Sequence, residues 1–268
     1  MLLTIDIGNT NMVFGIFEEK ELLGSFRLTT NSNSTSDEIG LMAVTYFERY
    51  GYKPEEVKAC LIASVVPQVM YSVTSAIIKY FGIYPLVIGT DVDTGLKFDP
   101  RCYESGKLGV DRAVDCIAAL KTYGAPFMII DFGTATTIDV VGPDGSYKGG
   151  TIAPGLQVSL DALVSRTAAL PRVELQMPPT VLGRNTVEQI QVGVVAGYVG
   201  NMEYLIRRIK EELGCPNIKV IATGGLSRMI AQQTDMIDVV DTQITLDGLR
   251  MIYEDNRDAK PIEIKNEL

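Results

Sequence analysis

Two stretches of the sequence place an aspartate and a glycine directly after an apolar run. The first reads LLTIDIGNTN over residues 2–11, and the second reads MIIDFGTATT over residues 128–137. Each apolar run predicts a buried strand, and the apolar residues after each turn predict the returning strand of a hairpin. A glycine in such a turn lets a phosphate group approach the backbone closely, because no Cβ intrudes.

Polar side chains around each glycine fit the same chemistry. Asp6 and Asp131 supply carboxylate oxygens, the ligands that Mg²⁺ or another cation accompanying phosphates prefers. Side-chain hydrogen-bond donors follow each turn, and they are Asn9, Thr10, Asn11, Thr134, Thr136 and Thr137. One such turn is explained equally well as an ordinary hairpin. Two copies at corresponding places favour a nucleotide polyphosphate held by two loops.

The chain of 268 residues contains no histidine. This excludes Ser-His-Asp and Cys-His catalysis and histidine-ligated zinc. Acid–base chemistry must therefore come from Asp, Glu, Lys, Tyr or Cys. Four cysteines are present, none of them in a C-x-x-C pair, and reduced thiols are expected at Cys60, Cys102, Cys116 and Cys215.

The formal net charge is −9, which argues against a general nucleic-acid or anionic-membrane binder. No apolar run approaches the ~18 residues of a membrane-spanning helix. The N-terminal residues MLLTID lack the basic region and cleavage site of a signal peptide. We therefore expect a cytoplasmic protein with no membrane or nucleic-acid partner.

The two aspartate–glycine stretches also indicate how the chain is organised. Asp131 lies 125 residues after Asp6, and strand-like and helix-like segments alternate after both. A repeat of this length predicts a duplicated α/β domain. We place the N-terminal domain at residues 1–118 and the C-terminal domain at 119–258, with a frayed tail at 259–268.

Three further segments combine turn residues with polar groups. ATGGLS over residues 222–227 includes Gly224 and Gly225. It predicts either a tight strand-to-helix turn or a stretch of backbone without side chains onto which a base or ribose packs. GGTIAPG over 149–155 predicts either a turn before a core helix or a wall of the cleft. LGRNTVEQ places Asn185 or Thr186 as a helix N-cap, which leaves the other free to face a ligand.

Segment 109–123 has apolar residues at helical spacing, with Asp111 and Arg112 in its first turn. A cation is disfavoured at the start of a helix by the helix dipole, so Arg112 is expected to have an anionic partner. That partner is either a ligand or, in a purely structural role, Asp115 or Glu104.

Together, the motifs DIGNTN, GVDR, DFGTATT, GGTIAPG, GRNT and ATGG resemble type III pantothenate kinase, in order and spacing and over nearly the whole chain. The aspartate–glycine stretches alone would indicate only the broader actin, Hsp70 and sugar kinase superfamily. The resemblance implies duplicated actin-like, ribonuclease H-like α/β domains, each a mixed sheet flanked by helices, with a nucleotide cleft between them. It also implies ATP-dependent phosphorylation of the 4′-hydroxyl of pantothenate, the first step of coenzyme A biosynthesis.

The resemblance further implies a cytoplasmic homodimer that uses Mg²⁺ and either K⁺ or NH₄⁺. Asp111 would be the catalytic base, Asp131 would bind the monovalent cation, and Asp6 would hold Mg²⁺ through the phosphates. The implied ATP contacts are Asp6, Ile7, Gly8, Asn9, Thr10, Asn11, Met12, Val13, Thr134, Gly224 and Gly225. The implied pantothenate contacts are Tyr103, Gly109, Val110, Asp111, Arg112 and, from the partner subunit, Thr186.

One position departs from the family. A substrate-contacting tyrosine usually lies nine residues before the catalytic aspartate, where this sequence has Cys102; Tyr103 follows it and takes that role here. Two other functions fit the same fold. A nucleotide-binding regulator would bind ATP without turnover, and a phosphatase or another sugar-type kinase would need a different acceptor pocket.

Overall fold

The computed structural model describes residues 1–102 and 108–261, which form two compact units. Unit 1 comprises residues 1–96, 108–121 and 243–261, and unit 2 comprises 97–102 and 122–242. The division near residue 121 lies close to the predicted boundary at 118. The C-terminal part of the predicted second domain differs, since residues 243–258 belong to unit 1. Of the predicted tail, residues 262–268 lie outside the described residues.

Unit 1 is built on a mixed five-stranded sheet in the order β3-β2-β1-β4-β5. Strands β1, β2 and β3 are antiparallel neighbours, whereas β4 and β5 run parallel to β1. The strands are β1 (Leu2–Ile7), β2 (Asn11–Glu18), β3 (Glu21–Thr29), β4 (Ala59–Ser64) and β5 (Leu86–Val87).

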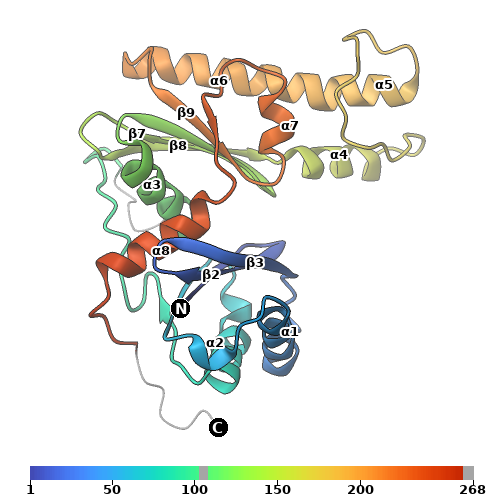
Figure 1. Ribbon diagram of the computed structural model, residues 1–268. Helices are drawn as coiled ribbons and strands as arrows, with labels where there is room; N and C mark the ends of the chain where they lie inside the picture. The colour runs from blue at the N-terminus through green and yellow to red at the C-terminus, as the bar shows by residue number, and fades with distance from the viewer. Residues whose placement is uncertain (103–107, 262–268) are drawn as a thin grey trace. The chain divides into compact units, whose positions relative to one another are not determined.

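Helices α1 (Ser36–Arg49) and α2 (Met70–Phe81) pack against each other and contribute to the main core of unit 1 (Figure 1). Two short 3₁₀ turns accompany them, η1 (Pro54–Glu56) and η2 (Pro67–Val69). Thr35 caps α1, since its hydroxyl accepts from Glu38 N–H and the Glu38 carboxylate accepts from Thr35 N–H. This capping box fixes where the helix begins after β3.

Helix α8 (Ile244–Asp255) contacts β1, β2 and β4 of the same sheet, and α3 (Val110–Tyr123) packs on α8. Gly15 of β2 faces Leu246, and Gly248 of α8 lies directly against Val114 of α3. A hydrogen bond of 2.6 Å from the Thr245 hydroxyl to the buried Asp115 carboxylate also joins α8 to α3. Unit 1 is therefore completed by α8, the last helix of the described residues.

Unit 2 repeats the strand order of unit 1, as β10-β9-β6-β7-β8. Strands β6, β7 and β8 are antiparallel neighbours, and β9 and β10 continue the sheet in parallel. The strands are β6 (Phe127–Phe132), β7 (Ala135–Val141), β8 (Tyr147–Pro154), β9 (Lys219–Thr223) and β10 (Val239–Val240). The matching order confirms the predicted duplication of a mixed α/β domain.

The helices of unit 2 are α4 (Leu156–Ser165), α5 (Thr186–Gln191), α6 (Gly197–Leu213) and α7 (Ser227–Ala231). A π-helical turn, Val192–Ala196, joins α5 to α6. Buried residues of α6 and of β6, β7 and β9 form one core cluster, so α6 covers a face of this sheet (Figure 1). None of the helices in the described part of the chain has the length and apolar character of a membrane span.

Candidate active site

The turn between β1 and β2, residues 8–11, is termed the first loop. Gly8 N–H donates to Asn11 O at 3.0 Å, and the tip residues Asn9 and Thr10 are exposed. Asp6, the next-to-last residue of β1, has a buried Oδ1 atom. The structure thus brings the predicted aspartate, glycine and polar residues together at one hairpin end.

Two of the predicted ATP contacts, Ile7 and Met12, have side chains buried in the core of unit 1. They can therefore meet a ligand only through their backbone. This agrees with a loop whose N–H groups do the binding.

Thr30, the residue after β3, holds the first loop from the side. Its hydroxyl donates to Gly8 O at 2.7 Å, and its backbone N–H donates to Thr10 O at 2.9 Å. Our sequence reasoning missed this residue. The sequence shows two threonines, Thr29 and Thr30, at the end of β3 and just after it. Only the pairing of β3 with β2 reveals what Thr30 contacts.

The turn between β6 and β7, residues 133–135, is termed the second loop, and it is one residue shorter. Gly133 N–H donates to Ala135 O at 3.2 Å, and Gly155 N–H donates to Thr134 O at 3.0 Å. A Cβ on Gly155 would collide with Gly133 O and Thr134 O. The GGTIAPG segment is therefore the support of the second loop, and glycine is needed where it ends.

Asp131 lies on β6 beside the β9–α7 turn that the ATGG motif forms. Asp131 is paired in register with Thr223, and the backbone of Gly224 has a φ of +88°. A Cβ on Gly224 would collide with Asp131 Oδ1, whereas a Cβ on Gly225 would meet open space. The structure therefore brings Asp131 and Gly224 together, with Gly225 exposed beside them.

Asp111 lies in the first turn of α3 and is half-buried. Its Oδ1 accepts from the backbone N–H of Arg112 at 2.8 Å, which holds the carboxylate over the helix start. A Cβ on Gly109 would lie 2.6 Å from that same oxygen, so glycine makes room for this side-chain position. Within the described residues, Oδ2 makes no hydrogen bond, which suits an atom that accepts a proton.

Arg112 is half-buried beside Asp111. Of its two structural partners considered from sequence, Asp115 accepts the Thr245 hydroxyl, and Glu104 lies outside the described residues. Tyr103 also lies outside them. The preceding residue, Cys102, has its thiol 3.7 Å from Tyr147 O.

Asn185 is the N-cap of α5, because its side chain accepts from Glu188 N–H at 3.0 Å. Thr186 is the first helical residue and is exposed. Glu188 accepts from the backbone of Arg184 and not from the N-cap residue. The structure thus assigns the capping role to Asn185, and Thr186 is the residue that can face a ligand.

The sequence matches the family described as "Type III pantothenate kinase" over residues 2–208. The chain belongs to that family. The matched range includes the first loop, the second loop, the start of α3 and Thr186. The resemblance drawn from the motifs is therefore confirmed.

Solved structures show that the fold extends beyond this kinase family. A candidate Baf-family transcriptional activator from Campylobacter jejuni superposes with a TM-score of 0.61 at 20% identity, covering 96% of this chain and 99% of that one. A candidate 2-dehydro-3-deoxygalactonokinase from Sinorhizobium meliloti gives a TM-score of 0.56 at 12% identity, covering 100% of both chains. These similarities establish the duplicated actin-like fold alone.

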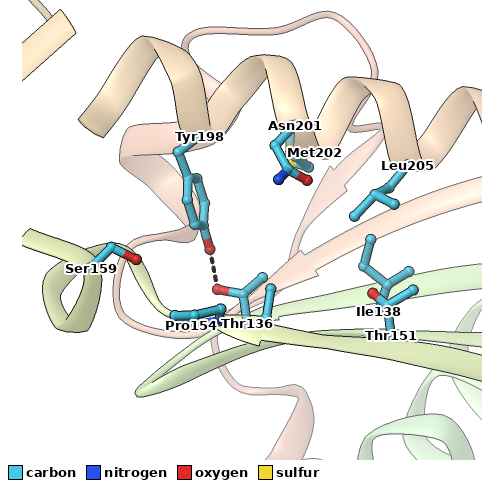
Figure 2. A pocket seen from close by; sticks show the side chains of 10 residues that line it. Thr136, Ile138, Thr151, Pro154, Ser159, Tyr198, Asn201, Met202 and Leu205 are labelled. Carbon is cyan, nitrogen blue, oxygen red and sulfur yellow. Dashed lines mark hydrogen bonds between the residues drawn. The ribbon is translucent and has the colours of Figure 1, made fainter. Parts of the chain in front are cut away.

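A cavity of about 130 Å³ lies in unit 2 between α6 and strands β7 and β8 (Figure 2). At one end, the Tyr198 hydroxyl and the Thr136 hydroxyl are hydrogen-bonded, and Thr136 is paired in register with Phe132 at the end of β6. Burial raises the pKa of Tyr198, and the Asp131 carboxylate raises it further. Tyr198 follows a π-helical turn, a feature frequent at functional sites, and no motif in the sequence pointed to it.

The carboxylates of Asp6 and Asp131, each just before its loop, fit the cations that the family implies. No group of three or more acidic or cysteine side chains in the described ranges could by itself hold a metal ion. A single carboxylate such as Asp6 suits Mg²⁺, which is usually held by one or two carboxylates together with phosphates and water. Asp131, beside the bare backbone of Gly224, offers oxygen ligands for a cation in the same way.

Proposed function

We propose that this protein phosphorylates the 4′-hydroxyl of pantothenate with ATP, the first step of coenzyme A biosynthesis. The observation that carries the proposal is the match to the pantothenate kinase family over residues 2–208. The carboxylate of Asp111, held at a helix start with one oxygen available, supports it.

In this proposal, the first loop and the strand residues on either side of it bind the ATP phosphates through the backbone of residues 6–13. Thr134 of the second loop, with Gly224 and Gly225, supplies the further ATP contacts that the family implies. Phosphoryl transfer depends mainly on positioning and charge neutralisation, which backbone N–H groups supply without covalent chemistry. Mg²⁺ beside Asp6 would neutralise phosphate charge, and Asp131 would bind K⁺ or NH₄⁺.

Asp111 orients the attacking hydroxyl and takes its proton. The hydroxyl oxygen bonds to the γ-phosphorus as the bond from that phosphorus to the β–γ bridging oxygen breaks, and ADP leaves. A carboxylate is a weak base for an alcohol proton. It suffices when the transition state is loose and the base acts mainly by orientation.

Arg112 would pair with the pantothenate carboxylate or with the transferring phosphoryl group. Gly109, Val110 and Tyr103 would complete the substrate pocket. Thr186 would reach the pantothenate of the partner subunit in a cytoplasmic homodimer. Its exposure supports this role, as does the exposure of large apolar side chains nearby, namely Val181, Leu182 and Val187.

The test is ADP release measured with Mg²⁺ and K⁺, with and without pantothenate, on the wild type and Asp111→Asn. We expect release that depends on pantothenate and falls on the order of 100-fold or more in the variant. Pantothenate-dependent turnover that survives in Asp111→Asn would remove Asp111 as an essential base. A folded, ATP-binding wild type without a pantothenate response would overturn the substrate assignment.

A second candidate is a nucleotide-binding regulatory protein on the same fold. The name of the structurally similar Campylobacter jejuni protein, a candidate transcriptional activator, favours keeping it. It predicts ATP binding without turnover and binding that tolerates Asp111→Asn. The assay above, combined with a nucleotide-binding measurement, separates the two functions.

A further inference from the structure

The first loop is held open by a side chain. In a hairpin with two residues at its tip, the backbone N–H after the tip usually closes the turn onto the carbonyl before it. In the first loop, Gly8 O accepts the Thr30 hydroxyl at 2.7 Å, and Gly8 N–H donates to Asn11 O at 3.0 Å.

Peptide geometry gives these bonds a directional consequence. In a trans peptide, the C=O and the following N–H lie in one plane and point in opposite directions. Because Thr30 binds Gly8 O through its hydroxyl, the N–H of Asn9 points away from Thr30. Because Thr30 N–H binds Thr10 O at 2.9 Å, the N–H of Asn11 also points away from Thr30.

We propose that Thr30 is a positioning residue that directs the Asn9 and Asn11 amides toward the ATP phosphates. The inference rests on the proposed function, since it assigns the first loop to ATP. Thr30 reaches the ligand only through the loop, because both of its bonds end on loop carbonyls. Its hydroxyl is the separable part, since a substitution that removes it leaves the backbone bond to Thr10 O in place.

The second loop provides an internal comparison. Gly155 occupies the place of Thr30, since both follow the third strand of their sheet and both donate a backbone N–H to the next-to-last residue of the loop, Thr10 or Thr134. Gly155 has no side chain to bind a carbonyl. The hydroxyl contact is therefore specific to the loop that carries the longer polar tip.

The test compares Thr30→Val, which keeps the shape and removes the donor, with Thr30→Ser, which keeps the donor. We expect Thr30→Val to weaken MgATP binding, measured calorimetrically without pantothenate, by about five- to tenfold, the effect of one lost hydrogen bond. Thr30→Ser should bind within about twofold of the wild type. In turnover, the KM for ATP should rise while the KM for pantothenate stays unchanged.

The matched control is Thr4→Val in the same sheet. Thr4 is buried, and its hydroxyl donates to Gly15 O at 3.3 Å, away from the first loop. We expect Thr4→Val to lower the melting temperature and leave MgATP binding unchanged. Amide hydrogen exchange without ligand gives a second measurement, and Thr30→Val should speed exchange in residues 8–12 specifically.

The outcomes distinguish this inference from the function on which it rests. A wild type that does not bind MgATP overturns both. A wild type that binds MgATP, with a folded Thr30→Val that binds it equally well, overturns the role of Thr30 alone. Equal weakening in Thr30→Val and Thr4→Val also overturns it, because the effect would then be one of general stability.

Discussion

The first loop and the second loop occupy the same place in two copies of one fold, yet they are supported differently. In unit 1, a threonine hydroxyl and a backbone N–H hold a four-residue turn. In unit 2, a buried glycine packs so tightly against a three-residue turn that no side chain fits. The two units thus share the same sheet but differ in what supports the loop. The first loop has a longer polar tip, and the second loop is packed more closely.

The two units also differ at the ends of β4 and β9, the strands that run parallel to β1 and β6. The register pairs Ser64 of β4 with Ile7, and Gly224 directly follows Thr223, the partner of Asp131. Ser64 of unit 1 therefore corresponds to Gly224 of unit 2, where the backbone approaches the carboxylate. In unit 2 the backbone of Gly224 therefore approaches the Asp131 carboxylate at a position where unit 1 has a serine.

The largest expected effect separates these two aspartates. Asp6→Asn should lower kcat/KM on the order of 100-fold or more, because the carboxylate beside Mg²⁺ and the phosphates loses its charge. Asp131→Asn should instead raise the K⁺ concentration needed for half-maximal activity by about tenfold, roughly 1.4 kcal/mol of cation binding. Steady-state assays across K⁺ and Mg²⁺ concentrations measure both. If the two variants respond alike to both ions, the assignment of different cations is wrong.

The next effect tests the loop supports through stability. Gly155→Ala should destabilise the protein by about 1–3 kcal/mol, because the methyl group is forced against Gly133 O and Thr134 O. Gly8→Ala is the matched control, since a Cβ there would meet only Asn11 O, at an ordinary 3.4 Å. Urea unfolding of both variants gives the comparison. Equal stability losses would contradict the tighter packing of the second loop.

A smaller effect concerns Tyr198, which contacts Thr136 in unit 2. In unit 1, the strand pairing places Met12, a buried apolar residue, at the position that corresponds to Thr136. Burial raises the pKa of Tyr198, so the stability from its neutral form is present below pH about 10 and is lost as the pH rises further. The melting temperature of Tyr198→Phe should therefore fall less than that of the wild type as the pH rises from about 9.5 to 11. Parallel alkaline slopes would contradict this.

The smallest effect is expected at the start of β8. Lys148 binds Asp144 at 2.7 Å and Asp99 at 2.8 Å, and Leu23 takes its place in unit 1. The hydrogen bond from Lys148 lowers the pKa of Asp144 to about 2, helped by Ser146. This stability is present above pH about 4 and is lost as the pH falls toward 2.

Asp144→Asn should accordingly lower the melting temperature slightly at pH 6, because the pair is exposed on the aspartate side. The difference from the wild type should shrink as the pH falls from 4 to 2. Lys53→Gln is the matched control, because no salt bridge to Lys53 is found among the described residues. A constant difference across this pH range would contradict the role of the ion pair.

The sequence predicted what depends on local pattern. The hairpins at Asp6 and Asp131, the duplication and the helix start at Asp111 all follow from apolar periodicity and turn residues within short windows. The family resemblance then assigned site roles to these positions. The structure brings several of them together, including Asp131 with Gly224.

What could not be predicted depends on contacts between distant segments. Thr30 reaches the first loop only because β3 pairs with β2, and Tyr198 reaches Thr136 only because α6 lies over β7. For the same reason, the sequence analysis placed the residues of α8 in the C-terminal domain, whereas they belong to unit 1. The contact of Leu246 with Gly15 of β2, more than 230 residues away in the sequence, shows which sheet α8 covers.

The position of α8 has a consequence for how the protein is made. The main segment of unit 2, residues 122–242, lies in the chain between the earlier segments of unit 1 and its last segment, which includes α8. A ribosome therefore finishes every strand of unit 2 before it synthesises Leu246, the residue that packs against Gly15. Unit 1, although it begins first, is the later of the two to close, and its high contact order predicts slower folding. A chain released after residue 242 would keep all of unit 2 and leave one face of the first sheet uncovered.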